Sequence, residues 1–361
     1  MERSTSSEIL HQILNMGEML LNAGAEIKRV EQTINRLGKA YGAARMDVFA
    51  ITSSIVVTMS FPDGTEITQT RRIEQPAGTD LSRLERLNAL SRRCCENGMS
   101  IQELAEEMDR IRKEDTGSWY VYLGSVIGAA AFSVFFGGTV QDGIAAGVFA
   151  LFICFCQNVL SPFCPNRVIF NLLCSLAAGI GIYGVTAVIP VFHADKIIIG
   201  DIMLLMCIRD RCIMSSDVWT AGIQLAMAFV GSLGFCMMFR LRAGLLVPAS
   251  LGGLFCWAVY LTGAQYVEGI FLPSFIASAF AATYAEVLAR KLKAPATLFL
   301  IPAVVPLVPG SGLYYTISYA VQGDLEVSAG YGTQTLQFVL GIACGMCIIW
   351  ALFTTVRPRK N

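Results

Sequence analysis

The sequence predicts a polytopic α-helical membrane protein with a small α+β domain at its N-terminus. Its mean hydropathy is +0.57 and 54% of its residues are hydrophobic, well above the average for soluble globular proteins. The charges are unevenly distributed, because 33 of the 54 Lys, Arg, Asp and Glu residues lie in positions 1–118 and only 21 lie in the remaining 243. We therefore predict a cytoplasmic α+β domain over residues 1–118, a first transmembrane half over 119–211 and a second over 212–361.

Four helices are expected in the N-terminal domain. Apolar residues recur at helical spacing over residues 6–42, and a break at 22–25 divides this segment into two helices. A third helix is predicted over about 80–96. A fourth begins at Ser100, where Ser100 and Glu103 match a capping box.

A β-hairpin is expected between these helix pairs. Residues 47–61 are rich in β-branched and aromatic side chains, residues 65–73 alternate, and Pro-Asp-Gly between them is a turn sequence. The first two helices also carry charged residues that either form a functional motif or lie on a solvated, partly ion-paired helix face, and the second interpretation is favoured. These soluble-domain motif residues are Glu18, Glu26, Arg29 and Glu31.

Nine apolar segments follow, and most of them are long enough to cross a hydrocarbon core of roughly 30 Å as a helix. The fourth is too short to do so as a straight helix. The segments run at about 119–137, 143–160, 168–190, 197–208, 218–238, 244–262, 269–289, 296–318 and 333–355.

Positive charges orient the second half by the positive-inside rule. The C-terminal residues 357–360 are basic, as are the loops at 290–293 and 240–242, so all three are predicted to be cytoplasmic. The loops 263–268 and 322–330 contain no Lys or Arg and are predicted to lie outside. The second half then has five spans, which begin outside and end in the cytoplasm.

The same rule leaves one crossing missing in the first half. With a cytoplasmic N-terminal domain, the loop 138–142 lies outside, Arg167 inside and the loop 193–196 outside, and the short fourth span returns the chain to the cytoplasm near Arg209 and Arg211. The next span must nevertheless begin outside. Two halves of five spans each would be consistent, and oppositely oriented halves with odd numbers of spans are typical of inverted-repeat transporters.

The fourth span of the second half contains prolines and glycines that predict a broken helix. The backbone groups freed by such a break can coordinate a solute, although a proline kink can also serve packing alone. Residues 199–205 occupy the corresponding place in the first half. The predicted substrate pathway comprises Asp201, Asn171, Pro302, Pro306, Pro309, Gly310 and Gly312.

Two ionisable residues within the spans are candidates for function, because burying a charge in a membrane is costly. Glu286 is the candidate for proton coupling, with an interfacial ion pair to Arg290 as the alternative. Asp201 lies near the outer end of its span, where it is either part of a site or a polar cap. Asn171 either hydrogen-bonds a solute or holds helices together.

Several other functions lack support in the sequence. The net charge is zero without a long basic run, so no nucleic-acid partner is expected. No Walker A motif occurs, which leaves the proton gradient or downhill efflux as the driving force. The Cys344–Cys347 pair lies within a span, and no metal or cofactor is expected. The alternative function is a membrane-anchored hydrolase or regulatory protein acting through the N-terminal domain, although His11 is the only histidine there.

Taken in order, the motifs resemble the bacterial threonine/serine exporter family, including split two-component relatives associated with succinate export. The resemblance covers nearly the whole chain. It implies ten spans, a cytoplasmic front domain and efflux of small amino acids or dicarboxylates across the bacterial inner membrane, with the C-terminus cytoplasmic. The residues that carry it are 17–21, 24–26, 29–31 and 47–49 in the front domain and 200–205, 284–286, 289–290, 293–295 and 302–310 in the membrane body.

The chain departs from the family pattern directly after Leu205. A family member would continue through a further break and a fifth span, whereas here residues 206–211 lead almost at once into the second half. We interpret 206–211 as a junction that joins a truncated first half to the second. The expected partners are the lipid bilayer and a small carboxylate-bearing substrate. A second copy of the chain or a separate membrane subunit is left open as an assembly partner.

Overall fold

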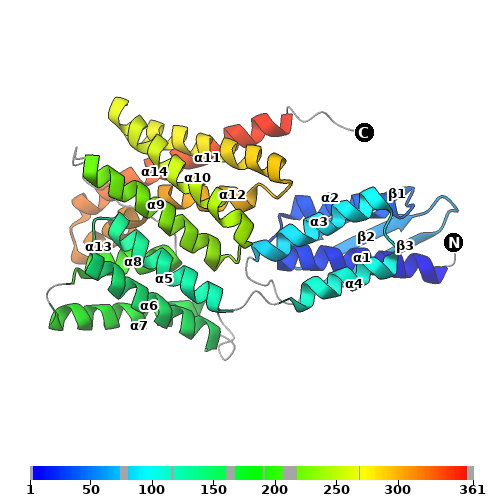
Figure 1. Cartoon of the computed structure of the whole chain (residues 1–361), viewed down its shortest axis with the longest axis horizontal. Helices are drawn as coiled ribbons and strands as arrows, with labels where there is room; N and C mark the ends of the chain where they lie inside the picture. The colour runs from blue at the N-terminus through cyan, green and yellow to red at the C-terminus, as the bar shows by residue number, and fades with distance from the viewer. Residues whose placement is uncertain are drawn as a thin grey trace. The chain divides into compact units, whose positions relative to one another are not determined.

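The computed structural model has two compact units. One comprises residues 1–116 with the short segments 239–242 and 293–295, and the other comprises 117–238, 243–292 and 296–361. Each is described by itself (Figure 1). The structure describes residues 3–73, 80–114, 118–159, 167–189, 192–205, 218–267 and 269–355.

The first unit contains a three-stranded antiparallel sheet in the order β1-β2-β3. The strands are β1 (Arg45–Ile51), β2 (Ser54–Ser60) and β3 (Glu66–Arg72). The single hairpin predicted from the sequence is therefore wrong by one strand, since the segment 47–61 folds back on itself where Ile51 pairs with Ser54. The β-branched and apolar residues on both sides of this tight turn conceal it in the sequence.

Helices α1 (Arg3–Asn22) and α2 (Ile27–Ala40) pack on one face of the sheet, and α3 (Leu81–Asn97) and α4 (Ile101–Lys113) pack on α1 and α2. Gly17 of α1 is closely packed against its neighbours, because a Cβ there would lie 2.8 Å from Ile34 and 3.0 Å from Ile55. The predicted capping box is present, with Ser100 and Glu103 each bonding the other's backbone N–H. The α+β prediction for this domain is confirmed.

The second unit is all helical, and each of the nine predicted spans corresponds to a helix or a broken helix. Five helices among the described residues are long and apolar enough to cross a membrane, and a bent pair would make a sixth. The elements are α5 (Ser118–Phe135), α6 (Val140–Val159), α7 (Arg167–Val188), α8 (Ala194–Leu205), α9 (Val218–Met238), α10 (Ala243–Tyr266), α11 (Phe271–Leu292), α12 (Thr297–Val304), η2 (Val305–Leu307), α13 (Gly310–Gln322) and α14 (Leu325–Thr355).

The helix packing repeats between the two halves. In the first half, α5 contacts α6 and α8, α7 contacts α6 and α8, and α6 contacts α8. In the second half, α9 contacts α10 and α12, α11 contacts α10 and α12, and α10 contacts α12. Every one of these first-half contacts therefore has its counterpart four elements later, as expected for an internal repeat.

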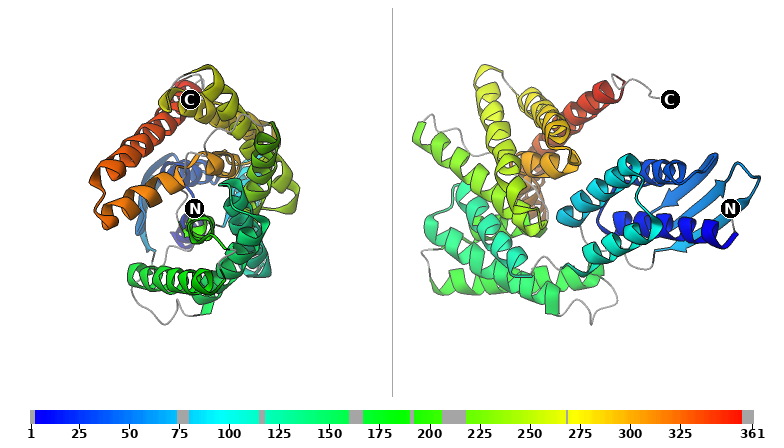
Figure 2. Two further views of the ribbon diagram at one scale, coloured as in Figure 1. Left: turned by 90° about the vertical axis from the view of Figure 1, so that its left-hand side faces the viewer. Right: turned by 45° about the vertical axis from the view of Figure 1, so that its right-hand side comes forward.

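Helices α5 and α9 run antiparallel where the two halves meet. Gly124, early in α5, packs against Met237 late in α9, whereas Phe132, late in α5, packs against Gly231 earlier in α9. Equivalent helices of the two halves thus point in opposite directions, which is the inverted arrangement that the sequence predicts. Figure 2 shows these helices from two further directions.

Helix α8 also runs antiparallel to α5, because Gly138 lies beside Lys196 and Ala129 lies beside Gly200. Helices α8 and α9 therefore run in the same direction although they follow one another in the sequence. One membrane crossing is therefore missing between α8 and α9, as the charge pattern predicts. The segment that joins them, 206–217, contains the predicted junction and lies outside the described residues.

Candidate functional site

The predicted break in the second half is present as a bent pair of helices. Helix α12 ends at Val304, the 3-10 turn η2 follows, and α13 begins at Gly310, with a bend of 46° between the two helical parts. In a continuous α-helix the N–H of residue 306 would donate to the Pro302 carbonyl. Pro306 has no N–H, so it cannot make this bond. The Ser232 hydroxyl on α9 donates to that carbonyl at 3.0 Å instead.

The predicted pathway residues of this break are all buried, and they are Pro302, Pro306, Pro309, Gly310 and Gly312. Asp201 is buried as well, on α8. Asn171 belongs to α7, but its side chain lies outside the described residues. Their roles in a substrate pathway stay predictions.

The short helix α8 and the second part of the broken span meet through a contact that the sequence analysis missed. The Tyr315 hydroxyl on α13 donates to the Asp195 carboxylate on α8 at 3.1 Å, and Lys196 lies 3.4 Å from the same carboxylate. The Tyr315 ring also packs against Tyr319 and Tyr331, with centroids 6.2 and 5.4 Å away. The only signal for this cluster in the sequence is the i, i+4 spacing of two tyrosines.

Two loops predicted to lie outside are joined at one end of the helical unit. The Asp142 carboxylate accepts hydrogen bonds from the Thr139 backbone and hydroxyl at 2.8 Å, and from the His193 backbone N–H at 2.8 Å. The His193 ring nitrogen Nδ1 lies 3.1 Å from the same carboxylate. Asp142 therefore caps α6 and holds the α7–α8 loop against it.

Comparison with known protein families supplies the identity of this arrangement. A family model described as a threonine/serine exporter matches residues 11–207, more than half of the chain. A second model, described as Threonine/Serine exporter, ThrE, matches residues 224–352.

The chain belongs to the threonine/serine exporter family.

It is therefore a multi-pass membrane transporter, and its family is one of exporters rather than enzymes. Neither match includes residues 208–223, the stretch between the short helix α8 and the second half. No curated protein and no solved structure matches the chain.

In this exporter, Glu286 lies close to a positively charged side chain. It lies on α11, its side chain is 17% exposed, and its carboxylate is 3.9 Å from the Arg290 guanidinium one turn later. Arg290 is half exposed and also stacks over the Phe353 ring at 4.7 Å. This geometry corresponds to the interfacial ion pair that was the alternative to proton coupling.

The motif residues of the exporter's N-terminal domain lie in separate places. Glu18 is 3.6 Å from Arg71 on β3, and the Glu31 carboxylate accepts a hydrogen bond from the Ala50 backbone N–H at 3.1 Å. Glu26 is exposed at the start of α2, and Arg29 is half-buried on that helix. Glu18 and Glu31 thus fasten helices to the sheet, as structural polar contacts do.

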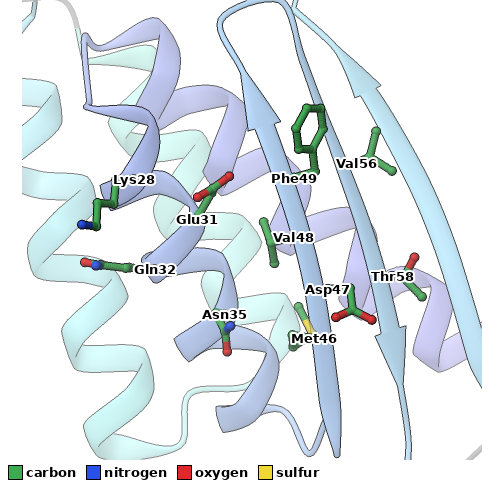
Figure 3. Close-up of a pocket in the computed structure, with 10 residues that line it drawn as sticks. All are labelled: Lys28, Glu31, Gln32, Asn35, Met46, Asp47, Val48, Phe49, Val56 and Thr58. Atoms are coloured by element: carbon green, nitrogen blue, oxygen red, sulfur yellow. The ribbon is translucent and has the colours of Figure 1, made fainter. Parts of the chain in front are cut away.

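A groove of about 640 Å³ lies between α2 and the β1 edge of the sheet (Figure 3). Helix α2 contributes a charged and amide-bearing side, and the strands contribute a largely apolar side on which the Phe49 ring is 60% exposed. The lining residues are Lys28, Glu31, Gln32, Asn35, Met46, Asp47, Val48, Phe49, Val56 and Thr58.

The lining of this groove contains no nucleophile paired with a histidine. Among its lining residues Thr58 carries the hydroxyl, which is 2.9 Å from the Thr68 hydroxyl, and no histidine lines it. His11 lies elsewhere, with its Nδ1 3.3 Å from an Arg71 nitrogen. Burial raises the pKa of the Cys94 thiol, which disfavours the reactive thiolate there.

Proposed function

We propose that this exporter moves small carboxylate-bearing metabolites, threonine and serine foremost, out of the cytoplasm across the bacterial inner membrane. Dicarboxylates such as succinate are a further substrate class in this proposal. The proton gradient is the proposed driving force, because the chain carries no nucleotide-binding motif that would couple export to ATP.

The observation that carries this proposal is the broken span α12–η2–α13 and its contact with the short helix α8. Discontinuous helices at the interface of inverted repeats form the binding sites of many secondary transporters, because they present unsatisfied backbone groups within the membrane. Here the contact is made by Tyr315 and Asp195. The α13 N-terminus at Gly310 offers backbone N–H groups to a substrate carboxylate.

The test of this proposal is efflux from liposomes that contain the purified full chain. Vesicles that contain the protein and are loaded with labelled threonine, serine or succinate should lose label faster than equally loaded vesicles without protein, with the amino acids released fastest. Release at the rate of protein-free vesicles for all three would contradict the proposal. Turnover of an ester or peptide substrate by the same preparation, without efflux, would favour the hydrolase alternative.

A matched pair of tyrosine variants tests the place of the pathway. Tyr315→Phe removes the hydroxyl that donates to Asp195, and a hydrogen bond to a charged group contributes about 1.5–3 kcal/mol. We expect this variant to lower the efflux rate about tenfold or more. Tyr266→Phe, at a position 87% exposed at the end of α10, should transport like the parent. Equal efflux rates for both variants would show that the α8–α13 contact is not part of the pathway.

A further inference from the structure

Asp201 is a buried carboxyl group that has no hydrogen-bond partner among the residues that the structure describes. Its side chain is 3% exposed, and within the part of the chain that the structure describes neither carboxyl oxygen has a hydrogen-bond partner. An ionised carboxylate in such a place would lose its hydration without compensation, which is strongly unfavourable. The arrangement therefore favours the neutral, protonated carboxyl in this conformation.

The helices packed on α8 provide little charge that could pair with Asp201. They are α5, α6, α7 and α13. The sequences of α5 and α13 contain no Asp, Glu, Lys or Arg, and α13 contributes the titratable phenols Tyr314, Tyr315 and Tyr319. On α6 the charged residue is Asp142, whose carboxylate accepts hydrogen bonds from Thr139 and His193. On α7 it is Arg167, whose side chain lies outside the described residues.

The charges on α8 itself are also engaged elsewhere. Asp195 and Lys196 are 3.4 Å apart, and Tyr315 donates to Asp195. Both lie more than one helical turn before Asp201, since five residues rise about 7.5 Å along a helix.

A second buried polar group without a partner lies on the neighbouring helix. The Ser133 hydroxyl on α5 has no hydrogen-bond partner within the described residues. A Cβ added to Gly200, the residue before Asp201, would lie 3.0 Å from the Ser133 Cβ and 2.8 Å from the Ala129 carbonyl oxygen. Buried polar groups are normally paired, so each of these two exceptions requires an explanation.

We propose that Asp201 is the group that binds and releases the proton coupled to export, an inference that rests on the proposed transport function. The carboxylate takes up one proton from the outer side to become a carboxylic acid, and it releases that proton to the cytoplasm as substrate leaves in the opposite direction. Asp201 then acts in coupling rather than in the predicted substrate pathway. Glu286, whose carboxylate lies 3.9 Å from the Arg290 guanidinium, is assigned to an ion pair rather than to coupling in this proposal.

The experiment compares two modes of transport by the full chain in liposomes. In the first, an imposed pH gradient drives efflux of labelled threonine at a clamped membrane potential. In the second, labelled threonine exchanges with unlabelled threonine at equal pH on both sides, which needs no net proton movement. We expect Asp201→Asn to abolish stimulation by the pH gradient and to retain exchange. Glu286→Gln, the matched control, should retain both.

The outcomes separate this inference from the proposed function. If the parent protein neither exchanges nor effluxes threonine, the transport function itself fails. If the parent responds to the pH gradient and Asp201→Asn responds equally, or if Asp201→Asn folds normally but loses exchange, Asp201 is not the coupling group. Efflux driven by a sodium gradient instead of the pH gradient would also overturn the proposal.

A conservative variant covers the case in which Asp201→Asn does not fold. Asp201→Glu keeps a titratable carboxyl but moves it by one methylene. We expect gradient-driven efflux to persist with its half-maximal pH displaced from that of the parent, whereas a purely structural role for Asp201 predicts an unchanged pH profile.

Discussion

At several positions in this exporter the structure depends on a residue that lacks a side chain or a backbone N–H. Glycine at positions 124 and 234 has no side chain, which lets the α5 and α9 backbones approach, and a Cβ on Gly124 would lie 2.6 Å from the Gly234 carbonyl oxygen. Close approach through small residues is a common way for membrane helices to associate, because dispersion contacts replace the hydrophobic effect there. Proline at position 306 lacks an N–H and thereby opens the broken span.

The α5–α9 contact gives a residue-level prediction. In Gly234→Ala the new methyl group would lie 2.7 Å from the Gly124 carbonyl oxygen and press on the Gly128 backbone. Overpacking of this kind costs about 1–3 kcal/mol, so the variant should unfold at a lower temperature in detergent. Gly222→Ala lies on the same helix with no atom within 4 Å of its Cβ, and it should match or exceed the parent. Equal melting temperatures for the two variants would contradict this packing.

At the scale of single elements, termini and breaks are stabilised by specific side chains. The broken span depends on Ser232 of α9, whose hydroxyl satisfies the carbonyl that Pro306 leaves without a donor. Helix α4 depends on the reciprocal bonds of Ser100 and Glu103. The two elements differ in how much of them the sequence reveals. The capping box is local and was predicted, whereas the Ser232–Pro302 bond joins residues 70 positions apart and was not.

Removing the Ser232 hydroxyl should destabilise the broken span. Ser232→Ala leaves the buried Pro302 carbonyl unsatisfied, which costs about 1–3 kcal/mol and should lower the melting temperature of the purified protein. Ser274→Ala is the matched control, because the hydroxyl of this buried serine donates locally, to the Ile270 carbonyl just before the start of its helix α11. A loss no greater than that of the control would show that the break does not depend on Ser232.

Helix α4 should respond to acid. The backbone and side chain of Ser100 lower the pKa of Glu103, so its charged form is favoured in the folded state. Its contribution to stability is therefore complete above the ordinary pKa of Glu, about 4.3, and is lost as the pH falls through the lower folded value. Hydrogen exchange of α4 amides should accelerate in that acidic range after correction for intrinsic rates.

The Glu103→Gln variant is the control for this acid response. It should lack the pH-dependent component but keep the Ser100 cap. Ser100→Ala should cost about 1 kcal/mol at neutral pH. Identical pH profiles for the parent and Glu103→Gln would contradict the assignment.

At the scale of the whole molecule, orientation in the membrane follows from charge and packing together. The basic loop segments 239–242 and 293–295 belong to the same compact unit as residues 1–116. The loops 138–142 and 193–196, which are predicted to lie outside, are joined to one another through Asp142 and His193. The proposed topology therefore has the N-terminal domain, both basic loops and the C-terminus in the cytoplasm.

Reporter fusions test this topology. A reporter that is active only outside the inner membrane should be inactive after residues 240 and 290, and active after residues 265 and 324. The reason is that two spans, α10 and α11, separate the basic loops, which returns the chain to the same side. A cytoplasm-specific reporter should give the complementary pattern. Activity of the two basic-loop fusions on opposite faces would contradict both the topology and the inverted arrangement.

The sequence by itself determined the class of this protein, its nine apolar segments and the place of the break, because burial in lipid and the properties of proline act locally along the chain. It also indicated the inverted halves, since charges in the loops report on orientation. Its errors and omissions have two causes. The Tyr315–Asp195 contact and the partner of Pro302 depend on which distant residues come together, whereas the tight turn between Ile51 and Ser54 is local but lies between residues of similar composition.

Only the tertiary structure distinguished Asp201 from Glu286. Both are acidic residues in apolar helices, and although the i, i+4 spacing of Glu286 and Arg290 favours an ion pair, the sequence does not show which groups surround Asp201. The structure brings Arg290 to within 3.9 Å of Glu286, and it surrounds Asp201 with helices that leave both of its oxygens without a described partner. Because the free energy of a buried charge depends on its surroundings rather than its identity, packing is the basis of the different roles that we propose for the two residues.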